Sequence, residues 1–319
     1  MTCPEYQSIC ITGGTGFLGR YVVEKLLATT KFPLRLLSRR PNEKSFANNS
    51  RISFIRGDIL DASSWKPFLQ PNSLVINLAY LEDASREENL RAVGGLLSLA
   101  DEKSCPRFLH CSTAVVVGKT STSTIDETTP CHPATEYERT KYDIEQLVSN
   151  RNAPKMETVS LRPTAIFGPG GKNLVKLADN LTNDTSALRF LKNSLYGKRK
   201  LNAVSVENVA AAISFLATTE KLVGGETYIV SDDDADENNY RDVTKYLSKT
   251  LKLHGCHFLH VPVPNFFLRR ALSLSSRSNT NPQRTYSSRK IESLGFRKPI
   301  SFFTGLVSFC EWYRERRQL

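Results

Sequence analysis

Eight residues near the amino terminus, T-G-G-T-G-F-L-G at 12–19, constrain the fold of this chain more than any other segment. They follow a short apolar run at 9–11 and precede a segment whose apolar residues have helical spacing. A glycine-rich turn between a strand and a helix is the context in which such a motif binds a dinucleotide. Gly13 would allow the tight turn, Gly16 would let a pyrophosphate approach the backbone, and Gly19 would let the helix lie close to the sheet. Free N–H groups and the helix dipole would then hold the phosphates, although an ordinary glycine-rich turn has the same pattern.

Apolar runs of strand length alternate with helical patterns through the first two-thirds of the chain. The expected strands are 8–12, 33–38, 51–56, 73–78, 106–112 and 156–161, and the expected helices lie near 18–29, 62–69, 85–102 and 134–150. Such alternation predicts an α/β fold of the Rossmann type, in which a doubly wound parallel sheet has helices on both faces. Ligands of these sheets bind at the carboxyl ends of the strands.

The alternation weakens after Gly170. From there we expect, in order, a helix and then a polar loop over 172–200, a helix over 208–217, a short strand over 227–230, a helix over 239–252, a loop over 272–285 and a helix over 301–317. We predict that residues 1–170, with part of 200–230, form the dinucleotide-binding Rossmann domain. Residues 171–319 would mostly form a small C-terminal α/β lobe that binds the substrate.

Net charge and cysteine spacing narrow the range of partners. The 319-residue chain has a formal net charge of +11, which suits nucleic acid, an anionic membrane or a phosphate-bearing small molecule. The sequence has no DNA-binding motif and no stripe of aromatic residues between basic ones, so we expect no nucleic-acid partner. Its seven cysteines include no C-x-x-C pair, so neither a metal site nor a redox disulfide is predicted.

Hydropathy bears on where the chain resides. No apolar run approaches the length of a membrane span. The first expected strand begins too early for a charged and then apolar signal peptide to precede it. We therefore expect a cytoplasmic enzyme that is not stably inserted in a membrane.

Three polar residues form a candidate catalytic set. Tyr137 and Lys141 lie four apart on an expected helix and so project from the same face. An ammonium beside a phenol lowers its pKa from about 10 toward neutrality, which makes tyrosine a usable general acid or base. Thr113 follows an expected buried strand, so its hydroxyl could hydrogen-bond and polarise a substrate carbonyl at the strand's carboxyl end. Taken singly, a solvent-exposed Tyr–Lys pair and a threonine that bonds the backbone remain alternatives.

Several motifs in a fixed order resemble the extended short-chain dehydrogenase/reductase family, which includes NAD-dependent epimerases and dehydratases. Besides the glycine loop and the Tyr137–Lys141 pair, they are Gly57-Asp58, Asn77-Leu78-Ala79, Ser112 to Gly118, Leu161 to Gly170, Val206 to Ala210 and the stretch from Tyr286 to Tyr313. The resemblance runs along nearly the whole chain. It implies a Rossmann fold, a nicotinamide cofactor and, in some members, a homodimer built around the Tyr-x-x-x-Lys helix.

The resemblance also implies a mechanism and a set of cofactor contacts. Thr113 and Tyr137 would hydrogen-bond the reacting oxygen, Tyr137 would carry the proton, and Lys141 would hold the nicotinamide ribose. Hydride would move between nicotinamide and the carbon that bears this oxygen. The positions that would contact the cofactor are Gly13, Thr15, Gly16, Phe17, Leu18, Gly19, Asp58, Ile59, Leu78, Ala79, Tyr137, Lys141 and Pro163.

The end of the second expected strand predicts which dinucleotide binds. NAD-preferring proteins place an acidic residue there for the ribose 2′-hydroxyl, whereas this chain has Ser38-Arg39-Arg40. Ser38 and the planar fork of Arg39 could bind a 2′-phosphate, and Arg40 could contact phosphate or adenine. We therefore predict NADP(H) in preference to NAD, with a pair of solvated loop arginines as the alternative.

The cofactor preference indicates the reaction. Epimerases of this family hold NAD and return the hydride to the same substrate, whereas NADP favours net reduction of a ketone. Dehydratases carry an acidic pair where this chain has Ala114-Val115, so dehydration is disfavoured. We predict reduction of a 4-keto nucleotide-diphosphate sugar, with Asn173, Arg199 and Arg284 as substrate contacts. A role in surface-polysaccharide synthesis follows from family analogy alone.

Other functions stay open at this point. One is a nucleotide-sugar 4-epimerase with bound NAD. Another, from a different class, is a non-catalytic NADP-sensing or scaffold protein, although such relatives usually lack the tyrosine or the lysine. Steroid-like and flavonoid-like ketones are reduced by other family members and would need an apolar pocket.

Overall fold

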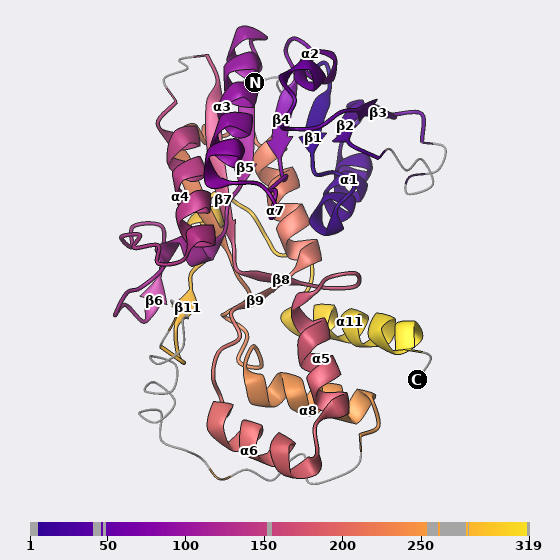
Figure 1. Cartoon of the computed structure of the whole chain (residues 1–319), viewed down its shortest axis with the longest axis vertical. Helices are drawn as coiled ribbons and strands as arrows, with labels where there is room; N and C mark the ends of the chain where they lie inside the picture. The colour runs from indigo at the N-terminus through magenta and orange to yellow at the C-terminus, as the bar shows by residue number, and fades with distance from the viewer. Residues whose placement is uncertain are drawn as a thin grey trace.

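A seven-stranded parallel sheet forms the centre of the molecule (Figure 1). The computed structural model describes residues 6–40, 46, 49–151, 155–253, 261, 279 and 281–317. The strands, in spatial order, are β10 (Glu226–Val230), β7 (Glu157–Pro163), β5 (Arg107–Cys111), β4 (Leu74–Asn77), β1 (Ile9–Thr12), β2 (Leu34–Ser38) and β3 (Ile52–Arg56). The chain winds outward from β1 in both directions, so the Rossmann-type doubly wound prediction is confirmed.

Helices cover both faces of the sheet. Side chains along each strand point alternately to one face and the other, so apolar residues are needed on both. Ile9 and Ile11 face the cluster formed with α1 (Phe17–Thr29) and α7 (Val206–Thr218). Cys10 packs with Val75 and Phe108 on the opposite face, beneath α3 (Arg86–Glu102) and α4 (Glu136–Ser149). Burial of both faces explains why these strands appear in the sequence as short, nearly continuous apolar runs.

The starts of the long helices differ in a way that matters for the site. α3 begins with a capping box, in which Ser85 Oγ accepts from the Glu88 N–H (3.1 Å) and the Glu88 carboxylate accepts from the Ser85 N–H (2.8 Å). α4 begins with the same arrangement between Thr135 and Glu138. The N-cap of α1 is Gly16, which has no side chain to accept a hydrogen bond. The first N–H groups of α1 therefore have no side-chain acceptor from a capping residue.

The C-terminal lobe lies below the sheet in the view of Figure 1 and has its own apolar cluster. Its helices are α5 (Asn173–Asn183), α6 (Ser186–Tyr196), α8 (Tyr240–Thr250) and α11 (Phe302–Arg317), next to the strand pair β8 (Ala165–Phe167) and β9 (Ala203–Ser205). The remaining elements are η2 (Ala62–Ser64), α2 (Trp65–Phe68), η3 (Ala114–Val117), β6 (Thr124–Ile125), β11 (Thr285–Tyr286) and α10 (Arg289–Ser293).

The prediction of a polar loop within 172–200 is wrong, because α6 occupies most of that range. Thr185 caps this helix by accepting from the Leu188 N–H (3.3 Å). α6 buries Asn193 and Ser194, and Asn193 Oδ1 accepts from Thr244 of α8 (3.1 Å). Leu188, Leu191 and Leu195 have helical spacing in this segment, so its sequence does carry the apolar periodicity of a helix. Most of the loop expected over 272–285 lies outside the described residues, and β11 begins at its last position.

The sequence has no apolar run that approaches the length of a membrane span. Within the described ranges, no helix is both long enough and apolar enough to cross a membrane.

Two adjacent glycines of α3 should respond oppositely to the same substitution. A Cβ at Gly95 would lie 2.2 Å from the Trp65 ring, whereas at Gly94 it would make ordinary contact with Leu147 at 3.4 Å. We expect Gly95→Ala to cost about 2 kcal/mol through overpacking, and Gly94→Ala to gain about 0.5–1 kcal/mol from helix propensity. Urea denaturation measures both free energies of unfolding. Equal effects of the two substitutions would contradict this packing of α3 on Trp65.

Candidate active site

The glycine loop is held by contacts that leave no room for side chains. Gly13 has a φ of +71°, and a Cβ there would lie 3.0 Å from the Ala79 nitrogen at the end of β4. At Gly19, in the first turn of α1, a Cβ would lie 2.1 Å from the Gly13 carbonyl oxygen. The Gly16 N–H closes the turn by donating to the same carbonyl (3.0 Å). The uncapped amino end of α1 is thereby fixed at the carboxyl end of β1, as the motif predicts.

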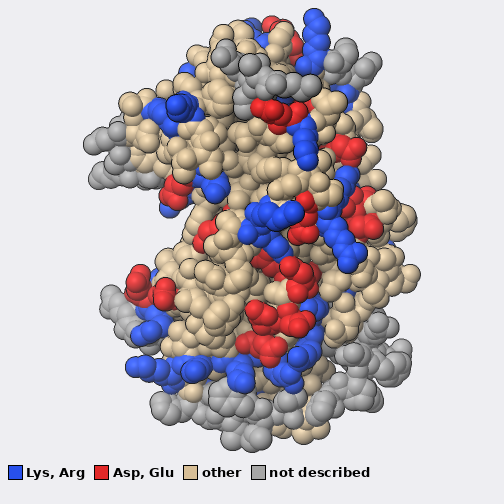
Figure 2. Space-filling view, turned by 180° about the vertical axis from the view of Figure 1, so that it is seen from behind, with Lys and Arg blue, Asp and Glu red and all other residues tan. Residues whose placement is uncertain are grey.

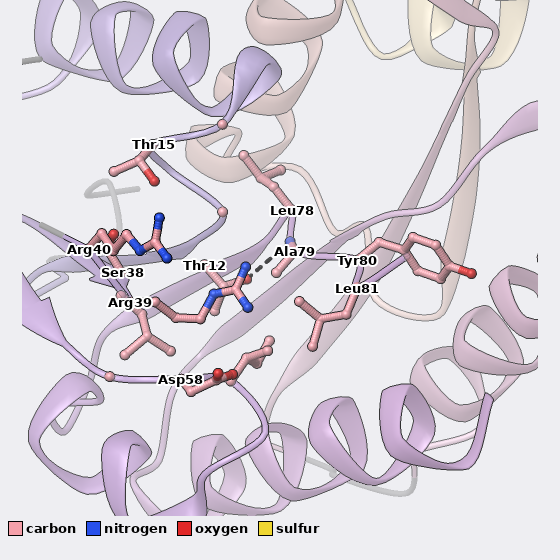
Figure 3. Close-up of a pocket in the computed structure, with 15 residues that line it drawn as sticks. Thr12, Thr15, Ser38, Arg39, Arg40, Asp58, Leu78, Ala79, Tyr80 and Leu81 are labelled. Atoms are coloured by element: carbon pink, nitrogen blue, oxygen red, sulfur yellow. Dashed lines mark hydrogen bonds between the residues drawn. The ribbon is translucent and has the colours of Figure 1, made fainter. Parts of the chain in front are cut away.

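A cavity of about 780 Å³ opens at the carboxyl ends of β1, β2, β3 and β4 (Figure 3). Ten of the predicted cofactor residues line it: Gly13, Thr15, Gly16, Ser38, Arg39, Arg40, Asp58, Ile59, Leu78 and Ala79. Phe17, Leu18, Gly19, Tyr137, Lys141 and Pro163 are not among its lining residues. Thr12 and Gly57, which belong to the recognised motifs, also line it, as do Leu37, Tyr80 and Leu81, which the sequence analysis did not single out. Tyr80 could have been predicted, because it directly follows the Asn77-Leu78-Ala79 motif.

One end of this cavity is basic. Figure 3 shows the Arg40 side chain directed towards Thr15 of the glycine loop and the Arg39 side chain extending between Thr12 and Asp58. No hydrogen bond or ion pair joins either arginine to another described residue, and both are exposed. The one carboxylate among the described lining residues is Asp58, whose Oδ1 accepts from the Leu60 N–H (3.0 Å). The two guanidinium groups are therefore available to an anion.

The three predicted catalytic residues converge where β5 ends. Thr113 is the N-cap of η3, and its hydroxyl interacts with the Tyr137 phenol. Lys141 is buried, with its Nζ donating to the Cys111 carbonyl (2.8 Å). Tyr137 lies one helical turn before Lys141 on α4 and is 44% exposed. The structure thus brings together a hydroxyl, a phenol and an ammonium that the sequence spacing predicted to be neighbours.

The expected lowering of the Tyr137 pKa is wrong for this structure. Partial burial of the side chain raises the pKa of Tyr137 to about 12, and the nearby Cys111 and Tyr80 act in the same direction, whereas the Thr113 hydroxyl opposes them. The Lys141 ammonium donates to the Cys111 carbonyl and lies over the Tyr80 ring, 5.2 Å from its centroid. Burial also lowers the pKa of Lys141. At neutral pH Tyr137 is therefore a protonated phenol and a proton donor.

A buried row of polar side chains connects the glycine loop to the catalytic strand. Thr12, Asn77 and His110 are in register across β1, β4 and β5. Thr12 Oγ1 donates to Asn77 Oδ1 (2.6 Å) and accepts from the Ala79 N–H (3.3 Å), and Asn77 Nδ2 lies 3.1 Å from His110 Nδ1. Because the Asn77 oxygen already accepts, its nitrogen donates, and His110 carries its proton on Nε2. That atom is buried without a partner among the described residues.

The predicted substrate residues are only partly brought together. Asn173 and Arg199 line one cavity of about 340 Å³ in the C-terminal lobe. Asn173 donates to the Ile166 carbonyl (2.6 Å), and the Arg199 guanidinium lies 5.8 Å from the Tyr196 ring centroid. Arg284 is not part of this cavity. It is fully buried, and its guanidinium donates to the backbone carbonyls at 118 (3.0 Å) and 120 (2.9 Å).

The basic excess of the chain is not gathered into a single patch on the face seen in Figure 2. Lys and Arg side chains there alternate with Asp and Glu in the middle of the molecule, and a basic row crosses its lower end. Several lysines form ion pairs, such as Lys192 with Asp184 (2.7 Å) and Lys290 with Glu226 (2.6 Å). Pairing of this kind reduces the field that the +11 net charge would otherwise produce.

Comparison with known proteins identifies the class. The model of the NAD dependent epimerase/dehydratase family matches residues 9–231, so the chain belongs to this family of enzymes. Among curated proteins it is similar to the decarboxylating sterol-4-alpha-carboxylate 3-dehydrogenase of Candida albicans, with 26% identity over 249 residues that cover 71% of each chain. The corresponding protein of Saccharomyces cerevisiae is 24% identical over 250 residues that cover 72% of each.

Solved structures share the fold along almost the whole chain. A dTDP-glucose 4,6-dehydratase from Streptomyces venezuelae, with NAD and a second ligand bound, superposes with a TM-score of 0.73 and 22% identity, covering 97% of this chain and 98% of the other. The WbmG enzyme of Bordetella bronchiseptica in complex with NAD and UDP gives a TM-score of 0.73 and 17% identity, covering 98% and 96%. At these identities the likeness is one of fold.

Because His110 is neutral in the folded chain, the free energy of unfolding should depend on pH. Burial lowers the pKa of His110 well below its usual range, and the Lys141 ammonium lowers it further. The unfolded chain takes up this proton below about pH 6.5, so the contribution to stability is present above that pH and is lost as the pH falls. From pH 7.5 to 5.0, the wild type should lose about 2 kcal/mol more free energy of unfolding than His110→Gln. Equal losses in urea denaturation would contradict the neutral imidazole.

Proposed function

We propose that this chain is an NADP(H)-dependent oxidoreductase that reduces a ketone, with hydride from NADPH and the proton from Tyr137. The observation that carries the proposal is the convergence of Thr113, Tyr137 and Lys141 at the end of β5, next to β4, whose carboxyl end borders the cavity at the glycine loop. We assign residues 1–170, with part of 200–230, to cofactor binding and residues 171–319 mostly to substrate binding.

The residues of the cavity fit a phosphorylated dinucleotide. The space beside Gly13 and Gly16 lies against backbone N–H groups at the uncapped start of α1, which suits a pyrophosphate. At the far end Arg39 and Arg40 face the cavity where an NAD-specific site would have a carboxylate. Ser38, which is buried at the end of β2, adds a hydroxyl next to them. A 2′-phosphate would find two cations and a hydroxyl there.

The protonation states support reduction. NADPH supplies the hydride when it is bound. Thr113 and Tyr137 would donate hydrogen bonds to the carbonyl oxygen, and the Tyr137 Oη proton would pass to that oxygen as negative charge develops on it. With a pKa of about 12, Tyr137 carries its proton at neutral pH. The buried Lys141 ammonium would then stabilise the resulting phenolate and hold the ribose.

Replacement of Arg39 should change the choice of cofactor. We expect the wild type to bind NADPH more tightly than NADH. Arg39→Ala removes a charge-assisted bond to the 2′-phosphate, so the Kd for NADPH should rise about 10- to 100-fold, while the Kd for NADH stays unchanged. Fluorescence titration with the two reduced cofactors measures both constants.

Arg56→Ala is the matched control for this experiment. Arg56 ends the neighbouring strand β3 and is exposed, but it does not line the cavity. Its replacement removes the same charge from the same side of the protein, so the Kd for NADPH should change by less than about threefold because only long-range screened electrostatics are lost. Tighter or equal binding of NADH by the wild type would overturn the NADP assignment.

Two substrate classes are favoured by separate observations. A nucleotide-diphosphate sugar with a 4-keto group is our first proposal, because Arg199 and Asn173 line the lobe cavity and one structural neighbour was solved with UDP-glucose and NAD. A sterol-like ketone is the second, because Leu174, Leu177 and Leu201 line the same cavity and two similar curated proteins are sterol-4-alpha-carboxylate 3-dehydrogenases. An NADPH-oxidation screen against both classes distinguishes them. A nucleotide-sugar 4-epimerase would instead retain bound NAD and consume no cofactor.

Removal of the Tyr137 hydroxyl should separate chemistry from binding. We expect Tyr137→Phe to lower kcat at least about 100-fold, because the variant has no proton to donate, and to leave the Kd for NADPH nearly unchanged. Tyr142→Phe is the control, since it makes the same change on the same helix outside the candidate site. Turnover that survives in Tyr137→Phe would refute the catalytic assignment. Absence of turnover in the wild type with every ketone, together with tight NADPH binding, would favour the sensing or scaffold function.

A further inference from the structure

Tyr80 is in contact with both members of the catalytic pair. Its ring meets the Tyr137 ring edge to face, with centroids 5.2 Å apart and planes at 84°. The Lys141 Nζ lies 5.2 Å from the centroid of the Tyr80 ring. Tyr80 follows the Asn77-Leu78-Ala79 motif and lines the cofactor cavity. In Figure 3 its ring points away from the arginine end of that cavity.

Both contacts suit the charge distribution of an aromatic ring. A cation is attracted to the negative face of an aromatic ring, and an edge-to-face pair joins the positive edge of one ring to the face of the other. The Lys141 ammonium is buried, so its attraction to the ring is little weakened by water. The Cys111 carbonyl binds the same ammonium at 2.8 Å. The ammonium is therefore held between a carbonyl oxygen and an aromatic ring.

We propose that Tyr80 is a positioning residue of the hydride-transfer site, whose ring fixes the orientation of the Tyr137 phenol and holds the Lys141 ammonium beside the Cys111 carbonyl. This inference rests on the proposed function of Tyr137 and Lys141. The ring rather than the hydroxyl performs this role, because no hydrogen bond joins the Tyr80 hydroxyl to a described residue. Phenylalanine at this position should therefore suffice, and an aliphatic residue should not.

The kinetic test compares Tyr80→Phe with Tyr80→Leu. With NADPH and the best ketone of the screen, Tyr80→Phe should keep kcat within about twofold, whereas Tyr80→Leu should lower it about tenfold, as expected for loss of two aromatic contacts. In Tyr80→Leu the decline of kcat with rising pH should begin at a lower pH, because loss of the ring reduces the burial that raises the pKa of Tyr137. Equal kcat values for the Leu variant and the wild type would overturn the proposal.

Tyr246→Leu controls for a general loss of aromatic packing. Tyr246 of α8 makes an edge-to-face pair with Phe303 of α11, with centroids 5.0 Å apart, in the C-terminal lobe. The same substitution there removes a contact of the same kind. It should lower the melting temperature and leave kcat and its pH profile unchanged. A matching fall of kcat in Tyr246→Leu would mean that stability, rather than positioning, explains the Tyr80 result.

A second measurement tests the geometry without any turnover. In protein labelled at the lysine ε-carbon, the ε-methylene resonance of Lys141 should be shifted upfield by the ring current of Tyr80, and Lys141→Arg identifies it by removing it. The shift should persist in Tyr80→Phe and disappear in Tyr80→Leu. A resonance at the ordinary position in the wild type would refute the contact. A shifted resonance in an enzyme that reduces no ketone would refute the proposed function and leave the contact standing.

Discussion

The close approach of the glycine loop to both β4 and α1 is the constraint on which the rest of the site depends. A Cβ at Gly19 would fall 2.1 Å from the Gly13 oxygen, and one at Gly13 would fall 3.0 Å from the Ala79 nitrogen. Backbone therefore packs against backbone, and the first turn of α1 is fixed at the end of the central strand. Because Gly16 provides no cap, no capping side chain uses the hydrogen-bonding capacity of the N–H groups in that turn, which begins directly after Gly16 at the wall of the cavity.

The buried polar row makes the cofactor cavity and the catalytic cluster parts of one framework. Buried polar atoms destabilise the folded state unless they are hydrogen-bonded. Here Thr12 bonds to Asn77 and Asn77 bonds to His110, so side-chain hydrogen bonds cross three neighbouring strands. The row begins at the Ala79 N–H beside Gly13 and ends on β5. Rotation or displacement of one strand would leave several buried donors unpaired. The distance between the dinucleotide loop and the end of β5 is therefore set by hydrogen bonds as well as by apolar packing.

The sequence predicted the parallel sheet because strands buried on both faces are short apolar runs between helical patterns. It did not predict α6, although Leu188, Leu191 and Leu195 have helical spacing, because the charged residues between them were interpreted as a polar loop. Motif spacing identified the cavity, but it could not reveal that Tyr80 contacts Tyr137 on another element, since such a contact depends on how the segment after β4 packs against α4. Nor can a sequence distinguish a ligand-binding arginine from Arg284, which binds backbone carbonyls in the interior.

The two ends of the candidate site bear differently on the proposed direction of reaction. At one end, Arg39 and Arg40 suit the phosphate that distinguishes NADP from NAD. At the other end, Tyr137 carries its proton at neutral pH and can donate it to a ketone. An unperturbed phenol would be protonated there too, and an epimerase also donates this proton during its turnover, so the phenol alone does not separate the two reactions. The arginine end is therefore the observation that favours the proposed net reduction over epimerisation.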